Sequence, residues 1–197
     1  MCIRDSPQGV APPVTVRPAA FDDAAAIARV YAPHVEASYA SFEEVAPDPA
    51  QIAHRMADPP RLPWLVAQHA GEVIGFAYAA HHRTRPAYRW SCDLSVYLDA
   101  GATGRGIGTA LYTRLVPLVR ELGQVSAYAA IALPNDASVR LHEAQGFTLL
   151  GVFRDVGFKG GAWRDVAWLH LPLVDPPPRP GEPLAWDGAP WPAGGAR

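Results

Sequence analysis

The chain has 197 residues, of which 49% are hydrophobic and 18% charged, and its formal net charge is -2. This composition is typical of a globular domain with a buried core, and it excludes a disordered chain. No run approaches the ~18 uninterrupted apolar residues that span a membrane, and the chain lacks the basic character of most nucleic-acid-binding domains. Its two cysteines, Cys2 and Cys92, exclude a disulfide framework and a zinc site of the Cys-x-x-Cys type, so a reducing cytoplasm is the expected location.

The distribution of prolines indicates where the domain ends. Eight of the 21 prolines lie between Pro172 and Arg197. Such a segment cannot form a helix or a central strand, so residues 174–197 are expected to be an extended tail that is loose or lies along the surface. Residues 1–13 lack hydrophobic periodicity and are expected to be an unstructured extension. The folded domain is therefore predicted over residues 14–173.

Hydrophobic periodicity predicts the elements of this domain. In chain order they are a strand at 14–17, helices at 21–38 and 48–56, strands at 64–68, 72–80 and 90–98, a helix from 107 to about 122, a strand at 125–133, a helix at 137–145, and strands at 148–156 and 162–171. The alternation in the strand at 90–98 places Ser91, Asp93, Ser95 and Tyr97 on one side and apolar residues on the other. This order of elements predicts a mixed α/β sheet.

A glycine-rich loop connects the strand at 90–98 to the following helix. Its sequence from Thr103 to Ala110 is TGRGIGTA. Backbone N–H groups at a helix N-terminus attract anions, and glycines let a phosphate approach closely. The loop alone fits a phosphate-binding site and a tight strand-to-helix turn equally well. It lacks the Gly-Lys-Ser or Gly-Lys-Thr of nucleoside triphosphate loops and the glycine spacing of dinucleotide-binding folds.

Motifs beyond the loop resemble a known family. The loop, a helix, a strand, Asn135, a second helix and Gly146-Phe147 follow each other as in the acetyl-CoA-binding half of GNAT acetyltransferases. The resemblance narrows to phosphinothricin and methionine sulfoximine N-acetyltransferases through the segments 88–90, 95–98, 133–144 and 156–166. It covers residues 14–173, and the proline-rich tail is also similar. It implies an α/β GNAT fold, with a mixed, mostly antiparallel sheet that is splayed at the acetyl-CoA site and has helices on both faces.

The resemblance also implies which residues carry function, with acetyl-CoA as co-substrate and no metal. The residues that it assigns to acetyl-CoA are Val96, Tyr97, Leu98, Gly104, Arg105, Gly106, Ile107, Gly108, Thr109, Asn135 and Ser138. Those that it assigns to an amino-acid substrate are Phe42, Arg83, Arg85, Tyr88 and Lys159. Asp93 stands where the family has a catalytic glutamate, and His142 where a tyrosine often protonates the leaving thiolate. Thr103 stands where the superfamily usually has glutamine or arginine.

These residue types suit the chemistry of acetyl transfer to an amine. The substrate ammonium must lose a proton before it attacks a thioester, and Asp93 is the candidate acceptor. Backbone N–H groups between Val96 and Leu98 could stabilise the oxyanion. His142 is a candidate acid or assisting base, or alternatively a packing residue. The three arginines of the loop at 81–89 suit the capture of a carboxylate or phosphinate, or alternatively form a solvated basic loop.

The sequence thus predicts an enzyme that moves acetyl from acetyl-CoA to the α-amine of a small anionic amino acid, such as phosphinothricin or methionine sulfoximine. One alternative is an acetyltransferase for another amine, such as a peptide N-terminus or a polyamine, although arginines at the site are against a polycation. Another is a weakly catalytic acyl-CoA-binding sensor, which the departures at Asp93 and Thr103 suggest. From the resemblance we also expect a homodimer, with no nucleic-acid or membrane partner.

Overall fold

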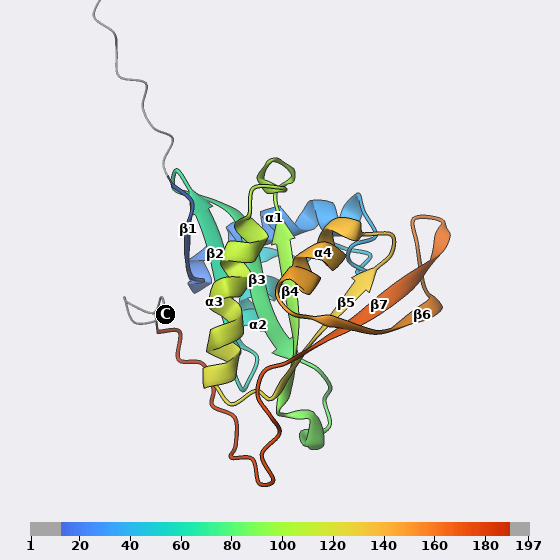
Figure 1. Cartoon of the computed structure of the whole chain (residues 1–197). Coiled ribbons are helices and arrows are strands. Elements are labelled where there is room, and N and C mark those ends of the chain that lie inside the picture. Colours follow the sequence, from blue (N-terminus) through green and yellow to red (C-terminus); the bar gives the residue numbers. More distant parts are fainter. Residues whose placement is uncertain (1–12, 190–197) are drawn as a thin grey trace, which may run out of the picture.

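The chain follows the predicted order of helices and strands. The computed structural model describes residues 13–189 (Figure 1). The strands are β1 (Thr15–Pro18), β2 (Trp64–His69), β3 (Glu72–His81), β4 (Ser91–Leu98), β5 (Ser126–Ala132), β6 (Thr148–Lys159) and β7 (Ala162–Pro172). The α-helices are α1 (Ala24–Glu36), α2 (Pro49–Ala57), α3 (Ile107–Glu121) and α4 (Asp136–Ala144). The described strands form one sheet in the order β1-β2-β3-β4-β5-β7-β6.

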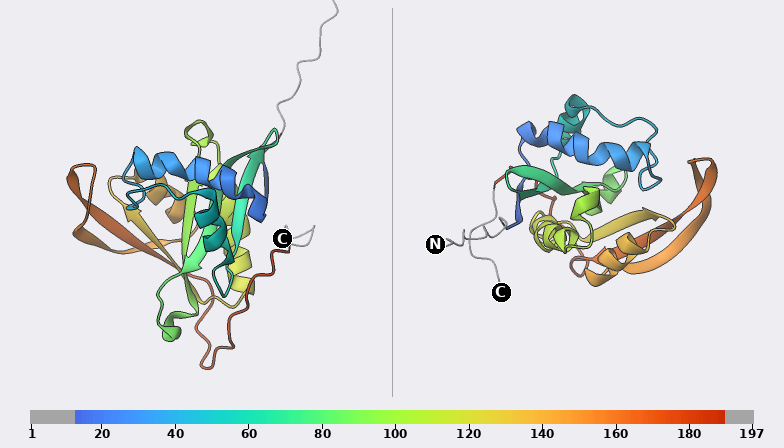
Figure 2. Two further views of the ribbon diagram at one scale, coloured as in Figure 1. Left: turned by 180° about the vertical axis from the view of Figure 1, so that it is seen from behind. Right: turned by 90° about the horizontal axis from the view of Figure 1, so that it is seen from above.

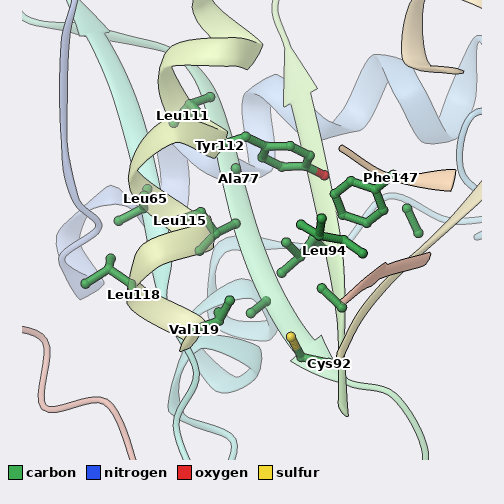
Figure 3. Close-up of a cluster of buried hydrophobic side chains, with 14 of the residues drawn as sticks. Leu65, Ala77, Cys92, Leu94, Leu111, Tyr112, Leu115, Leu118, Val119 and Phe147 are labelled. Atoms are coloured by element: carbon green, nitrogen blue, oxygen red, sulfur yellow. The ribbon is translucent and has the colours of Figure 1, made fainter. Parts of the chain in front are cut away.

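Helices cover both faces of the sheet, as Figure 2 shows from above. The helices α1 and α2 lie on one face, where Ile27 and Val30 of α1 pack against Phe76 of β3. The helix α3 lies on the other face and buries Leu111 and Leu115 against β2, β3 and β4 (Figure 3). Each helix buries one apolar face against the sheet, which is why apolar residues recur at helical spacing in α1 and α3. The mixed α/β sheet with helices on both faces is confirmed.

The sheet divides between β4 and β5. Among the described strands this is the one parallel pair, and it spans three residue pairs, from Ser91–Ser126 to Asp93–Tyr128. Beyond it, β4 stays paired with β3 as far as Leu98, and β5 stays paired with β7 as far as Ala132. The facing edges of β4 and β5 therefore separate after Asp93, which is the splayed geometry that the resemblance implied.

The strand β6 is longer than predicted, because it extends to Lys159 instead of ending at Val156. Its register to β7 shifts between Phe153 and Gly157. Asp155 lies within this irregular stretch with a φ of 49°, and its backbone N–H donates to Oδ1 of Asp165 at 2.9 Å. A bulge breaks the alternation of side chains, which is why a period of two residues could not locate the end of the strand.

Residues 174–189 contain no helix or strand and lie along the domain. The backbone N–H of Leu184 donates to the carbonyl of Leu122, and that of Trp186 to the carbonyl of Arg61, both at 2.8 Å. The Trp186 side chain is 5% exposed, with the Arg61 guanidinium 5.8 Å from its ring centroid. Burial of this indole anchors the segment to the domain.

The same segment also contacts the basic loop between β3 and β4. The Glu182 carboxylate accepts hydrogen bonds from Arg89 at 2.7 Å, and the Trp90 indole N–H donates to the Gly181 carbonyl at 2.7 Å. The rest of the predicted tail, residues 190–197, and the predicted extension up to residue 12 lie outside the described residues. Within residues 13–189, no helix combines the length and the apolar character that crossing a bilayer requires.

Candidate active site

A pocket of about 510 Å³ opens where β4 and β5 separate. Its walls are the free edges of the two strands, the glycine-rich loop with the start of α3, and the first turns of α4. The residues that line it include Leu94 to Leu98, Thr103, Gly104, Gly106 to Thr109, Ala129 to Ala132, Asn135, Ser138, Leu141 and His142. Unpaired backbone groups of both strands therefore face the interior of the pocket.

The glycine-rich loop ends in the N-terminus of α3. Gly106 is the residue before the helix and has a φ of 76°, and Gly104 has a φ of 71°. The first N–H groups of a helix have no partner within the helix, and they carry its positive dipole end. Backbone donors therefore point from α3 toward the pocket, as binding of an anion requires.

The second helix of the pocket begins at Asn135, whose side chain caps α4. Its Oδ1 accepts from the backbone N–H of Ser138 at 3.1 Å, which leaves its amide NH₂ as a donor. A Cβ atom on Gly108 would lie 2.8 Å from the Leu141 side chain, so glycine at this position allows α3 and α4 to approach closely. The two helix N-termini thereby share one pocket.

The structure brings together nearly all residues predicted to bind acetyl-CoA. Of that set, every residue except Arg105 lines the pocket. His34, to which no role was given, also lines it and hydrogen-bonds the Leu98 carbonyl through Nε2 at 2.9 Å. No sequence signal marked His34, because α1 and the end of β4 meet only in the fold.

His142 lines the pocket, but both of its ring nitrogens are occupied. Nδ1 lies 2.8 Å from the Ser138 carbonyl oxygen and Nε2 lies 2.9 Å from the Tyr112 hydroxyl. A carbonyl only accepts, so Nδ1 carries the proton and Nε2 accepts from Tyr112. Burial lowers the pKa of His142, which the hydrogen bond to Ser138 opposes, and the neutral ring is favoured. Its one proton is held by the backbone, which is against the predicted role as an acid for the thiolate.

Asp93 lies at the point where the sheet divides and forms a pair with His82. Oδ1 of Asp93 is 2.7 Å from Nδ1 of His82, and the two side chains are 29% and 12% exposed. Burial raises the pKa of the Asp93 carboxyl, while the hydrogen bond from His82 and the charge of Arg83 lower it. Because Asp93 is the last β4 residue paired with β5, this pair lies at the narrow end of the opening.

Aromatic rings surround the His82 imidazole. Tyr128 of β5 stacks on it with a centroid distance of 4.4 Å, and Tyr88 and Trp168 meet it edge to face at 6.0 and 5.9 Å. The Arg83 guanidinium lies 5.4 Å from the Trp168 centroid and donates to the His82 carbonyl at 2.9 Å. The predicted residues Arg83, Tyr88 and Asp93 therefore meet in one cluster around His82, a residue that no sequence motif marks.

Of the other predicted substrate residues, Arg85 lies in the same loop as Tyr88 and Phe42 lies against β6. Arg85 is exposed at the start of the short 3-10 helix Pro86–Tyr88, and its side chain has no hydrogen-bond partner among the described residues. Phe42 is 42% exposed and lies against β6, where a Cβ on Gly157 would come within 2.2 Å of its ring. Arg85 is thus free to bind an anion, and Phe42 covers a different edge of the domain.

Lys159 binds the protein itself. Its ammonium donates to the backbone carbonyls of Val35, Ser41 and Glu43 at 2.5–2.7 Å. These bonds use all three of its donors and fix the loop between α1 and α2. This geometry is against the substrate contact expected of Lys159. Among the described residues, no group of three or more His, Cys, Asp or Glu side chains is placed to hold a metal ion.

Comparisons with known proteins agree on one family. The sequence profile described as "Acetyltransferase (GNAT) family" matches residues 28–147. A phosphinothricin N-acetyltransferase of Streptomyces viridochromogenes is 39% identical over 176 residues, which cover 87% of this chain and 95% of the relative. An L-methionine sulfoximine/L-methionine sulfone acetyltransferase of Pseudomonas aeruginosa is 33% identical over 165 residues, 81% of this chain and 94% of the relative.

Solved structures agree with the sequence matches. The crystal structure of a GNAT superfamily phosphinothricin acetyltransferase from Sinorhizobium meliloti, in complex with AcCoA, has a TM-score of 0.81 and 37% sequence identity to this chain. The superposition covers 86% of this chain and 94% of that one. The profile match includes the glycine-rich loop, Asp93 and α4.

Proposed function

This chain belongs to the GNAT acetyltransferase family, and on that premise we propose that it transfers acetyl from acetyl-CoA to the α-amine of a small anionic amino acid. The observation that carries the proposal is the arrangement around the divided sheet. The pocket between the separated ends of β4 and β5 is bordered by two helix N-termini, and the His82–Asp93 pair, with Arg83 beside it, lies at the last paired residues of these strands, next to Leu94 of the pocket wall. The helix N-termini suit an anionic cofactor, and the neighbouring pair is a basic centre beside a cation.

The pocket has the groups that acetyl-CoA requires. Backbone N–H groups from Gly106 to Thr109 would hold its pyrophosphate, and the free edges of β4 and β5 would pair with the amides of its pantetheine arm. The Asn135 amide adds one donor to that arm. When bound, the co-substrate supplies an activated acetyl thioester, and N–H groups between Val96 and Leu98 would stabilise the oxyanion that forms on attack.

The loop between β3 and β4 supports an anionic amino acid as the second substrate. Arg83 is fixed beside the basic pair, and Arg85 carries a guanidinium without a protein partner among the described residues. Arginine suits bidentate binding of a carboxylate, phosphinate or sulfoximine group. A polyamine would meet like charges at this loop.

Thiol release from acetyl-CoA with a panel of amines tests the proposed function. We expect turnover with phosphinothricin, methionine sulfoximine or methionine sulfone, and none with spermidine or an unblocked peptide. Arg85→Ala should raise the KM for the amino acid by about 30-fold, which corresponds to the ~2 kcal/mol of a charged contact at the low end of the usual range. The KM for acetyl-CoA should stay the same, and Arg120→Ala, at the far end of α3, serves as the matched control. Turnover confined to peptides or polyamines would contradict the proposed substrate class.

An exposed apolar surface supports a homodimer. The β6–β7 hairpin presents six large apolar side chains that are 50–62% exposed, namely Leu149, Leu150, Phe153, Val156, Phe158 and Trp163. Several large apolar side chains exposed on one hairpin are a feature of interaction sites in soluble proteins. We name these six residues the β6–β7 patch and assign a second copy of the chain as its partner.

A further inference from the structure

We propose that His82 is the group that accepts the proton of the amine and that Asp93 orients it, so that the base is a His–Asp pair. The inference rests on the proposed function and deepens it, because it assigns a further catalytic residue to the same site. It departs from the expectation that the Asp93 carboxylate receives the proton by itself.

The hydrogen bond between the two side chains sets the state of the imidazole. An ionised carboxylate only accepts, so at 2.7 Å the Nδ1 of His82 must donate its proton to Asp93. In the neutral ring the lone pair then lies on Nε2. No described residue hydrogen-bonds Nε2. Within residues 13–189, the side-chain atoms that lack a partner and are fully buried are His69 Nδ1, Gln124 Oε1 and Trp168 Nε1, so Nε2 of His82 retains some exposure to solvent. Nε2 is therefore an accessible acceptor.

The ring is held in one place by its neighbours. Tyr128 lies nearly parallel to it, with an interplanar angle of 20°, and Trp168 stands at 86° to it. Asp93 holds Nδ1 from β4, so contacts from β4, β5 and β7 fix the ring at once. A base fixed in this way does not pay an entropic cost for orientation during the reaction.

The position of His82 explains why aspartate can serve at this strand position. The resemblance leads to a glutamate, whose side chain is one methylene longer. In this chain the Asp93 carboxylate ends at the imidazole, and the Nε2 atom on the far side of the ring becomes the reactive group. The reactive atom of the pair therefore lies farther from β4 than the Asp93 carboxylate does, at the point where β4 and β5 start to separate.

The charged and titratable groups that face the imidazole are few. They are the Asp93 carboxylate on β4, the Arg83 guanidinium and the Tyr88 hydroxyl on the loop, and the Tyr128 hydroxyl on β5. Asp93 stabilises the imidazolium that forms, as in a catalytic triad. Arg83 opposes that charge and is placed to attract the anionic group of the substrate instead.

The proposed step conserves atoms and charge. The lone pair of Nε2 takes one proton from the substrate ammonium and forms a neutral amine and an imidazolium. The amine nitrogen attacks the thioester carbonyl, the carbon–sulfur bond breaks, and the sulfur keeps the bonding electrons. The second proton of the nitrogen ends on the thiolate, which leaves as coenzyme A thiol, and the imidazolium releases its proton to solvent.

The test measures thiol release by the full chain with whichever amine the wild-type protein acetylates. His82→Gln should lower kcat/KM for the amine by about 10²-fold to 10⁴-fold, the usual effect of a positioned base. Affinity for acetyl-CoA should not change. The loss should shrink as the pH rises, because more of the amine then arrives already neutral. His81→Gln is the matched control, because among the described residues this neighbouring histidine, which lies opposite Cys92, makes no hydrogen bond or ion pair with Asp93.

Two further variants separate the base from a structural role. In His82→Ala, added imidazole should restore part of the activity, because a small base can occupy the space that the side chain leaves. The double variant His82→Gln/Asp93→Asn should lose no more than the more damaging single variant, since residues that act as a unit are not additive. Wild-type turnover by His82→Gln, losses that multiply in the double variant, or a loss without imidazole rescue would each overturn the proposal. Turnover with peptides alone would contradict the proposed substrate class and leave the test of His82 intact.

Discussion

Gly106 offers the sharpest test of the proposed phosphate-binding loop, because a side chain there would meet no neighbouring protein atom. The residue precedes α3 with a φ of 76° and a ψ of 4°, which is left-handed backbone. A Cβ atom at this position would meet no heavy atom within 4 Å. A loss of coenzyme A binding on substitution would therefore come from backbone strain in the loop or from a side chain in the space that the phosphate would occupy, and not from a clash within the protein.

The size of the effect follows from that strain. A non-glycine residue in left-handed backbone costs about 1–2 kcal/mol, and a loop that relaxes in the free protein must restore the strained form on binding. Gly106→Ala should therefore raise the Kd for coenzyme A by about 5-fold to 30-fold, at 1.4 kcal/mol per factor of ten. Gly106→Val should lose more, since β-branched residues are rarest in this region. Gly106→Asn should lose least, since asparagine tolerates it.

Calorimetric titration with coenzyme A measures the series, and circular dichroism verifies that each variant is folded. Gly101→Val is the matched control, because Gly101 lies in the short 3-10 helix Ala100–Ala102 of the same β4–α3 connection, also has open space around it, and does not have a positive φ. The expected order of affinity is wild type, Asn, Ala, Val, with the control near wild type. Unchanged affinity in Gly106→Val, or an equal loss in Gly101→Val, would refute the assignment of this loop to coenzyme A.

Two further predictions concern the surface. Trp186→Ala removes a buried indole, a change that typically costs about 3–5 kcal/mol of stability. Because this loss raises the population in which the segment is detached, limited proteolysis between residues 175 and 189 should become at least about tenfold faster. Leu184→Ala is the control and should not change the rate, because the Leu184 side chain is 63% exposed. Trp163→Glu places a charge in the β6–β7 patch and should convert the proposed dimer to a monomer, as measured by the sedimentation coefficient. Leu184→Glu, outside the patch, should leave the dimer intact. A wild-type protein that sediments as a monomer would contradict the proposed dimer.

Much of the fold could be predicted because its local signals agree with its tertiary structure. The helix α3 buries Leu111 and Leu115 at helical spacing, and the first half of β4 alternates between buried and half-buried residues, so the period of the pattern indicates both elements. The glycine-rich loop was predicted for a similar reason, since positive φ values at Gly104 and Gly106 require a residue without a side chain. The pocket residues were predicted from the resemblance to the GNAT family, which assigns them to acetyl-CoA.

The pairing of His82 with Asp93 could not be predicted from period, because it depends on register. His81 of β3 lies opposite Cys92 of β4, and the backbone N–H of His82 donates to the Ser91 carbonyl at 3.4 Å. His82 is thus diagonal to Asp93 on the same face, a relation that cross-strand pairing allows. The register of β3 against β4 places the two side chains together, and this register cannot be read from the sequence because a long basic loop connects the strands. The hydrogen bonds of Lys159 could not be predicted either, because their acceptors lie more than a hundred residues earlier in the chain.

The division of the sheet explains why the basic pair and the cofactor pocket can coexist in one small domain. Each of the two strands beside the opening stays paired on its outer edge, so its inner edge can remain free without unfolding. Free strand edges of this kind can bind a partner with amide groups. Asp93 and Tyr128 form the last closed pair, and they hold His82 from two strands. The proposed base therefore lies where the closed part of the sheet meets the separated strands, which would combine fixed positioning with proximity to the pocket.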